Sequence, residues 1–159
     1  MFRIYRDTRF SKNKAPYKTH ASVHFRHAAG KDVHAPGFYL HLEPKNVFIG
    51  AGIWHPDPKA LLKIRTAIQD NPGNWKKAKG ARPFTARFTL QGESLKRPPR
   101  GFDPAHPAIE DLQRKDFIAT AEFKQAEALR SDFMTMFAKA CQSASPFMAF
   151  LTQALDLPW

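Results

Sequence analysis

Two strand-like runs separated by a short turn constrain the fold of this chain more than any other feature. In residues 37–43 apolar and polar side chains alternate, which is the period of a half-buried strand. The turn sequence Pro44-Lys45-Asn46 follows, and residues 47–54 return as an almost wholly apolar run. The pattern therefore predicts a β-hairpin.

The remaining elements follow from the same kind of periodicity. Further strands are predicted over residues 21–27, 84–90 and 117–123. Helices are predicted from Asp57-Pro58, around Trp75, after His106-Pro107, over residues 124–143 and from Ser145-Pro146. In the longest helix, Leu129, Phe133 and Phe137 are predicted to share the buried face.

Strands and helices do not alternate strictly along the chain, which argues against a doubly wound parallel sheet. We therefore expect an α+β fold with a mostly antiparallel sheet of about five strands and helices packed mainly on one face. The length fits one domain, so residues 1–159 are predicted to form a single domain.

Polar side chains gather on one face of the predicted sheet, opposite the apolar set of each strand. They are His24, Arg26, Tyr39, His41, Arg87, Thr89, Thr120 and Glu122. One interpretation is a solvated sheet face. The other is a shallow polar pocket in which histidine beside arginine does acid–base work. On the strand of residues 47–54, Gly50 and Gly52 leave room for close packing or a bulge.

The chain carries a formal net charge of +11, and two segments supply the excess. Residues 1–34 hold eight Lys and Arg against two acids, and residues 76–100 hold eight against one. A basic excess favours anionic partners. We therefore expect a phosphate-bearing small molecule as the partner, with nucleic acid as the second choice.

The first basic block lies within residues 6–20, where aromatic and hydroxyl side chains are interleaved with the charges. Lys and Arg offer several donors to phosphate oxygens, and Arg can bind them with two parallel hydrogen bonds. The anion-binding candidates here are Arg6, Arg9, Lys14 and Lys18. The supporting candidates are Asp7, Tyr17, His20 and His24. The alternative is a loop whose charges are merely solvated.

The second basic block is the run from Lys96 to Phe102. Its two prolines hold the backbone extended, so Arg97 and Arg100, three residues apart, project to the same side. A preset backbone lowers the ordering cost of binding. Both arginines are anion-binding candidates, and the alternative is a stiff surface connection.

Several classes of site and protein are excluded or disfavoured. The single cysteine, Cys141, excludes an intramolecular disulfide, and no activator is predicted beside it. The histidines lack the further ligands that a metal site needs, so no metal is predicted. No phosphate loop or dinucleotide fingerprint is present, so no cofactor is predicted. No run approaches the roughly 18 apolar residues of a membrane span, so we expect no membrane contact and a cytoplasmic location.

The motifs of both blocks resemble a mainly bacterial family, the domain-of-unknown-function 2461 family. The resemblance is carried by Arg6 to Ser11, Lys14, Pro16 to Lys18, His20, Gly37 to Tyr39, Gly50 to Gly52, Lys96 to Phe102 and His106-Pro107. It covers nearly the whole chain and implies no particular activity. The stretch at Gly50 departs modestly, because the family pattern often has three glycines there.

A second departure from the family lies at the start of the chain. The resemblance implies a helical segment ahead of the motif at Arg6, whereas Met1 stands almost on that motif. The sequence is then either a natural short form or a truncated one. If the missing helices normally cover part of the sheet, we expect an uncovered sheet face and a homodimer formed through it.

Three functional hypotheses remain open. The first is an anion-binding domain in which both basic blocks converge on one phosphate site. The second is an enzyme acting on a small phosphorylated or carboxylated substrate. In it, Arg6, Arg9 and Arg100 hold the anion, and His20, His24 or Asp7 moves a proton. The third is a non-catalytic interaction module, in which Asp7 and the arginines form a buried structural network.

Overall fold

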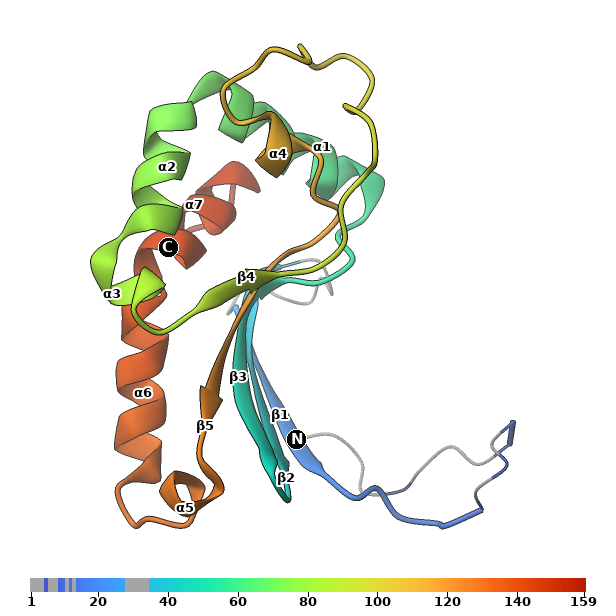
Figure 1. Ribbon diagram of the computed structural model, residues 1–159, viewed down its shortest axis with the longest axis vertical. Coiled ribbons are helices and arrows are strands. Elements are labelled where there is room, and N and C mark those ends of the chain that lie inside the picture. The colour runs from blue at the N-terminus through green and yellow to red at the C-terminus, as the bar shows by residue number, and fades with distance from the viewer. Residues whose placement is uncertain (1–4, 6–8, 11, 13, 28–34) are drawn as a thin grey trace.

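A computed structural model describes residues 5, 9–10, 12, 14–27 and 35–159. Its centre is a five-stranded sheet in the order β1-β2-β3-β5-β4, and all four pairings are antiparallel (Figure 1). The strands are β1 (Ala21–Arg26), β2 (Gly37–Glu43), β3 (Asn46–Ile53), β4 (Thr89–Gln91) and β5 (Phe117–Phe123). This confirms the predicted α+β class with its mostly antiparallel sheet.

The predicted hairpin is β2 and β3. Glu43 pairs with Asn46, so the turn between them has two residues. Pro44 presets its own φ, and Lys45 takes the second turn position at φ 67°, which is the pattern of a type II turn. The backbone N–H of Lys45 donates to the side-chain Oε1 of Gln125 at 2.9 Å, and this bond ties the turn to the end of β5.

The described part of the chain contains seven helices, which lie mainly on one side of the sheet (Figure 1). They are α1 (Pro58–Asp70), α2 (Pro72–Gly80), α3 (Arg82–Thr85), α4 (Ile109–Leu112), α5 (Gln125–Ala128), α6 (Phe133–Ser143) and α7 (Ser145–Ala154). Asp57 caps α1 as predicted, because its Oδ1 accepts the backbone N–H of Ala60 at 2.7 Å. None of the helices described is long and apolar enough to cross a membrane.

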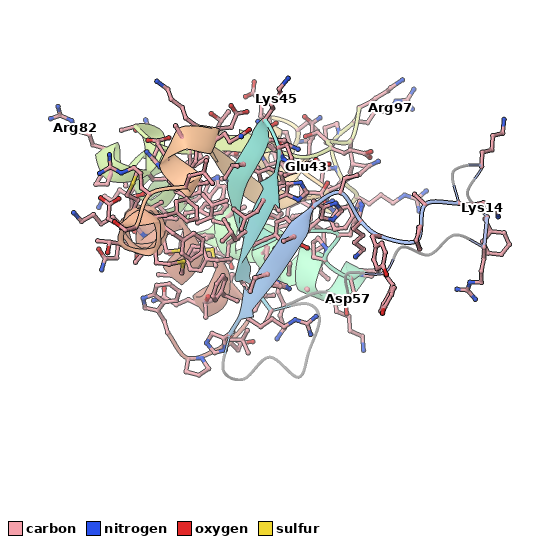
Figure 2. The ribbon with its side chains drawn as sticks, turned by 90° about the horizontal axis from the view of Figure 1, so that it is seen from below. Lys14, Glu43, Lys45, Asp57, Arg82 and Arg97 are labelled. Atoms are coloured by element: carbon pink, nitrogen blue, oxygen red, sulfur yellow. The ribbon has the colours of Figure 1, made fainter. Side chains whose placement is uncertain are left out.

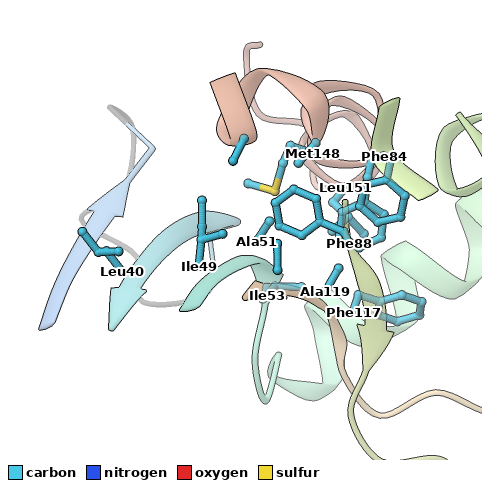
Figure 3. Close-up of a cluster of buried hydrophobic side chains, with 14 of the residues drawn as sticks. Leu40, Ile49, Ala51, Ile53, Phe84, Phe88, Phe117, Ala119, Met148 and Leu151 are labelled. Carbon is cyan, nitrogen blue, oxygen red and sulfur yellow. The ribbon is translucent and has the colours of Figure 1, made fainter. Parts of the chain in front are cut away.

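The hydrophobic core lies between the sheet and these helices (Figure 3). Ile49, Phe117 and Phe147 are fully buried there, and each such side chain stabilises the fold by roughly 1.5–3 kcal/mol relative to an exposed one. Trp75 of α2 is 1% exposed and makes an edge contact with Phe117 at 5.8 Å between ring centroids. The opposite face of the sheet carries no helix from the part of the chain described (Figure 1).

The prediction of a strand over residues 84–90 is wrong over most of its length. Residues Arg82–Thr85 form α3, and the strand β4 covers only Thr89–Gln91. Pro83 fits the first turn of a helix. Phe84 and Phe88 stack at 5.5 Å, and residues four apart share a face in a helix and in a strand alike. Their alternation therefore did not distinguish the two structures.

The predicted helix over residues 124–143 is also wrong in its extent, since α5 and α6 are separate helices. The backbone N–H of Lys124 is capped by Glu127 Oε2 at 2.6 Å, and a new helix begins after Asp132. Asp132 pairs with Arg130 at 2.7 Å in the connection. Leu129, predicted to face the core, is 80% exposed because it lies in that connection.

Candidate functional site

The register of the sheet sorts the polar side chains onto the face without helices. Two rows of paired residues cross it: His24, Tyr39, Gly50, Thr120 and Thr89 in one, and Arg26, Gly37, Gly52, Ile118 and Gln91 in the next. His41 and Glu122 both pair with Phe48 in the row beyond. The predicted shared face is confirmed for seven of its eight residues. It is wrong for Arg87, which follows α3 and places its guanidinium 4.4 Å from the ring of Phe123.

A groove of about 680 Å³ is hollowed into this face. We call it the sheet-face groove. Its basic and polar lining comes mainly from β1 and the residues before it, and comprises Lys18, His20, Ser22, His24 and Arg26. Its aromatic lining is Tyr39, Phe48 and Trp54, of which Trp54 is 70% exposed. The volume is within the range of small-molecule sites.

Glycines of β2 and β3 form the floor of the sheet-face groove. At Gly52, φ is 120° and an added Cβ would lie 2.0 Å from the carbonyl oxygen of Phe117, so the backbone requires glycine there. At Gly37, a Cβ would lie 2.7 Å from Nε2 of His24, so glycine lets that imidazole rest against the strand. Gly50 differs, because its nearest neighbour would be 3.6 Å away and an alanine would fit.

His24 and Arg26 form a fixed pair on the groove wall. The Nε of Arg26 donates to Nδ1 of His24 at 3.3 Å. Partial burial lowers the pKa of His24 below its ordinary value of 6.5, and the charge of Arg26 lowers it further. The imidazole is therefore a neutral acceptor at neutral pH, and it orients the guanidinium beside the groove.

A hydrogen-bonded chain runs along the same face of β2. Tyr39 Oη lies 3.1 Å from Nδ1 of His41, and Nε2 of His41 lies 3.3 Å from Oε2 of Glu43. Glu43 also accepts from the Thr19 hydroxyl at 2.7 Å and from the Asn46 amide at 3.3 Å. The hydrogen bond from Thr19, followed by those from Asn46 and His41, lowers the pKa of Glu43, which is therefore ionised at neutral pH.

Ring stacking fixes His41 in the middle of this chain. Its imidazole stacks on the ring of His20 at 4.7 Å and on the ring of Phe48 at 4.8 Å, and the residue is 8% exposed. A buried, oriented imidazole between a hydroxyl and a carboxylate can accept a proton from the one while the other stabilises its charge.

The first basic block reaches the groove only at its end. Of its candidates, Lys18, His20 and His24 line the sheet-face groove. Figure 2 shows Lys14 on the extended segment, far from the sheet. The remaining candidates are Arg9, Tyr17, Arg6 and Asp7. Arg9 lies 6.0 Å from the ring of Phe10, and Tyr17 packs on Tyr5 at 5.6 Å between ring centroids. Arg6 and Asp7 fall outside the described residues. The buried network expected of an interaction module includes Asp7, so it falls outside them too.

The structure does not bring the second basic block to the same place. Arg97 and Arg100 are exposed on the connection between β4 and α4, and neither lines the groove. Figure 1 places this connection at the end of the sheet opposite residues 14–20. Convergence of the two blocks on one pocket is therefore not found among the described residues. The anion-binding role of Arg97 and Arg100 stays a prediction.

Sequence reasoning missed Glu43, Phe48 and Trp54 as site residues. Tyr39, His41 and Glu43 are spaced two apart on one predicted strand, so their shared face was visible in the sequence. Phe48 and Trp54 lie in the apolar run of residues 47–54, where no alternation with polar residues marks a separate face. Pairing with β2 and β5 decides which side chains of this run face the groove.

Outside the groove, the described residues show little that resembles a reactive centre. They contain no cluster of three or more His, Cys, Asp or Glu that could hold a metal ion. Burial raises the pKa of Cys141 to about 11, so its thiol stays protonated at neutral pH.

The fold and the groove together define a small α+β protein with a ligand-sized recess on the open face of its sheet. The chain belongs to the DUF2461 family of conserved hypothetical proteins, whose model matches residues 1–150 and confirms the resemblance seen in the motifs. No curated protein and no solved structure matches the chain.

Proposed function

We propose that the protein binds a small organic anion in the sheet-face groove, with a phosphate-type group on its basic wall and a planar apolar part against its aromatic wall. One observation carries the proposal. Among the described residues that line the groove there are Lys18, Arg26 and two histidines but no carboxylate. The positive charges of this lining attract an anion.

The shape of the groove supports a planar ligand. The glycine floor at Gly37, Gly50 and Gly52 lets a ligand approach the backbone, and Trp54 and Phe48 offer aromatic surface beside it. Phosphate oxygens accept charge-assisted hydrogen bonds from guanidinium and ammonium groups, which are stronger than neutral ones. The proposal uses only the end of the first basic block.

The test compares 1-naphthyl phosphate with 1-naphthol by isothermal titration calorimetry. The phosphate should bind at least ~10-fold more tightly, because charge-assisted hydrogen bonds contribute about 1.5–3 kcal/mol each. Arg26→Gln should weaken binding of the phosphate by a similar factor. Arg82→Gln, the same substitution at an exposed arginine of α3 that does not line the groove, serves as its matched control and should leave the affinity unchanged.

A second pair of variants tests the place of binding. Gly50→Ala adds a methyl group to the groove floor without a steric clash, so it should weaken 1-naphthyl phosphate binding while the protein stays folded. Gly73→Ala makes the same change on α2, where nothing lies within 4 Å, and should have no effect on binding. Equal affinities for phosphate and naphthol, or a Gly50→Ala variant that binds normally, would contradict the proposal.

Two expectations from the sequence concern the cellular location of the protein and its oligomeric state. A cytoplasmic location stays a prediction, and so does a homodimer through the open sheet face, which would cover the groove and compete with ligand binding there. Light scattering that finds a monomer at high concentration would count against the homodimer.

A further inference from the structure

We propose that Tyr39 is a nucleophile in the sheet-face groove, activated by His41 and Glu43, and that it accepts a phosphoryl-type group from a bound aromatic anion. The inference rests on the proposed function for the substrate, but its chemistry comes from the hydrogen-bonded chain along β2. Tyr39 is the group that would touch the substrate, and His41 and Glu43 are positioning residues.

The polarity of the chain follows from its last member. The ionised carboxylate of Glu43 can only accept, so Nε2 of His41 carries the hydrogen of their 3.3 Å contact. In a neutral imidazole the other nitrogen is then an acceptor, and Nδ1 receives the Tyr39 hydroxyl at 3.1 Å. In this tautomer of His41, the Tyr39 hydroxyl can donate to a base that is itself backed by a negative charge.

The chain is also rigid, which a proton-transfer site needs. The rings of His20 and Phe48 fix the plane of the His41 imidazole. Thr19 and Asn46 hold the two oxygens of Glu43 at 2.7 Å and 3.3 Å. Such supporting contacts decide whether a catalytic constellation keeps its geometry.

The surroundings of Tyr39 leave space for a substrate. On β3 its cross-strand partner is Gly50, and on β1 its partner is His24. The bare glycine keeps the groove open beside the phenol ring, and the basic wall lies on the other side. Arg26 and Lys18 line the same groove and supply positive charge for the negative charge that develops on a phosphoryl group.

The proposed step transfers the phosphoryl group from the aryl oxygen of the substrate to the Tyr39 oxygen. The Tyr39 oxygen forms a bond to phosphorus while the bond from phosphorus to the aryl oxygen breaks. The tyrosine proton passes to Nδ1 of His41, and the resulting imidazolium is stabilised by the Glu43 carboxylate. The aryl oxide leaves and takes a proton from water, and no oxidant, reductant or metal ion is consumed.

Sulfonyl fluorides test this nucleophile directly, because their sulfur(VI) centre resembles a phosphoryl group and fluoride is the leaving group. The folded full chain is treated with neutral benzenesulfonyl fluoride, and labelling of each tyrosine is followed by peptide mass spectrometry. Tyr5 and Tyr17 are 62% and 58% exposed and act as internal controls. Exposure alone favours these two, whereas the proposal requires half-buried Tyr39 to be labelled at least ~10-fold faster.

Glu43→Gln removes the charge behind His41 with little change in shape and should slow Tyr39 labelling about tenfold, leaving Tyr5 and Tyr17 unchanged. Glu122→Gln is the matched control, because it removes a carboxylate from the same sheet face and should have no effect. Thr19→Val, a substitution at an exposed residue that releases Glu43, should slow labelling in the same direction even if Glu43→Gln is unstable. Tyr39 labelling no faster than that of Tyr5, or insensitive to Thr19→Val, would overturn the proposal.

A charged reagent separates this proposal from the proposed function. 4-(Fluorosulfonyl)benzoate carries a carboxylate and should label Tyr39 faster than the neutral reagent does, by a factor that Arg26→Gln removes. Fast labelling by both reagents at equal rates would keep the nucleophile and contradict anion binding. Slow labelling of Tyr39 by both would overturn the nucleophile, while naphthyl phosphate binding would still be judged by calorimetry.

Discussion

His24 illustrates how one residue couples the groove to pH. Its pKa is lowered by partial burial and then by Arg26, whereas in the unfolded chain it returns to about 6.5. On acidification the unfolded state therefore takes up the proton first. The free energy of unfolding should fall as the pH drops below about 6.5 and through the lowered pKa of the folded state.

The first prediction is that the free energy of unfolding depends on pH through His24. In urea titrations, wild-type stability should decrease between pH 7.5 and pH 5, and His24→Gln should show a smaller decrease over the same interval. Glu43 adds its own loss only at lower pH, because its ordinary value is 4.5 and its pKa in the folded protein is lower still. A His24→Gln variant with an unchanged slope above pH 5 would contradict the assignment of a neutral, desolvated His24.

For individual residues, the sequence predicted which side chains share the polar face of the sheet, but it did not predict the groove in that face. Period-2 alternation assigned His24, Tyr39 and His41 to one side of the sheet, because that side depends on strand geometry alone. The groove depends on register, which brings Gly37 beside Gly52 and Gly50 beside Tyr39. These pairings are not local in the sequence, so the glycines appeared only as room for packing.

Among the elements, the strands β3, β4 and β5 meet at one buried carboxylate. Asp116, just before β5, is 1% exposed and accepts the backbone N–H of His55 at 2.8 Å and that of Glu93 at 3.1 Å. His55 follows β3, and Glu93 follows β4. Asp116 therefore joins the ends of three strands, of which β4 has only three residues.

The second prediction concerns this junction. Asp116→Ala leaves two backbone N–H groups without their acceptor and should lower the free energy of unfolding by about 2–4 kcal/mol, measured by urea denaturation. Asp156→Asn provides the comparison, because it removes an exposed charge that pairs with Lys63 at 2.7 Å while keeping a residue type suited to the φ of 58° there, and it should cost no more than about 0.5 kcal/mol. Similar losses in the two variants would show that Asp116 does not hold the strands together.

Elements were predictable where their signals were local. The hairpin of β2 and β3 was recovered nearly residue for residue, because alternation and turn chemistry lie in adjacent sequence. The region of α3 and β4 was not, because Phe84 and Phe88 satisfy both periods and because β4 exists through its pairing with β5. The break between α5 and α6 had a signal at Ser131-Asp132, residues typical of a helix start, that the apolar periodicity obscured.

For the whole molecule, the question is whether the charge of +11 forms one surface. Figure 2 shows labelled basic side chains pointing in different directions, with Arg82 and Lys14 on opposite sides and Arg97 apart from both. A continuous track along a nucleic-acid backbone needs these charges on one face. These labelled side chains therefore do not share one face, and the salt dependence of binding distinguishes the localised anion site proposed above from a nucleic-acid track.

The last prediction tests that choice by salt. Binding of 1-naphthyl phosphate in the groove should weaken no more than about threefold between 50 and 300 mM NaCl, because a small ligand with close contacts is screened only partly. A single-stranded oligonucleotide that neutralised many of the basic residues would release counterions and lose several orders of magnitude in affinity over the same range. Both are measured by calorimetry, with the oligonucleotide also added as a competitor. An oligonucleotide that binds tightly, displaces naphthyl phosphate and shows the steep slope would mean that the groove is one part of a nucleic-acid surface, and the small-ligand assignment would fall.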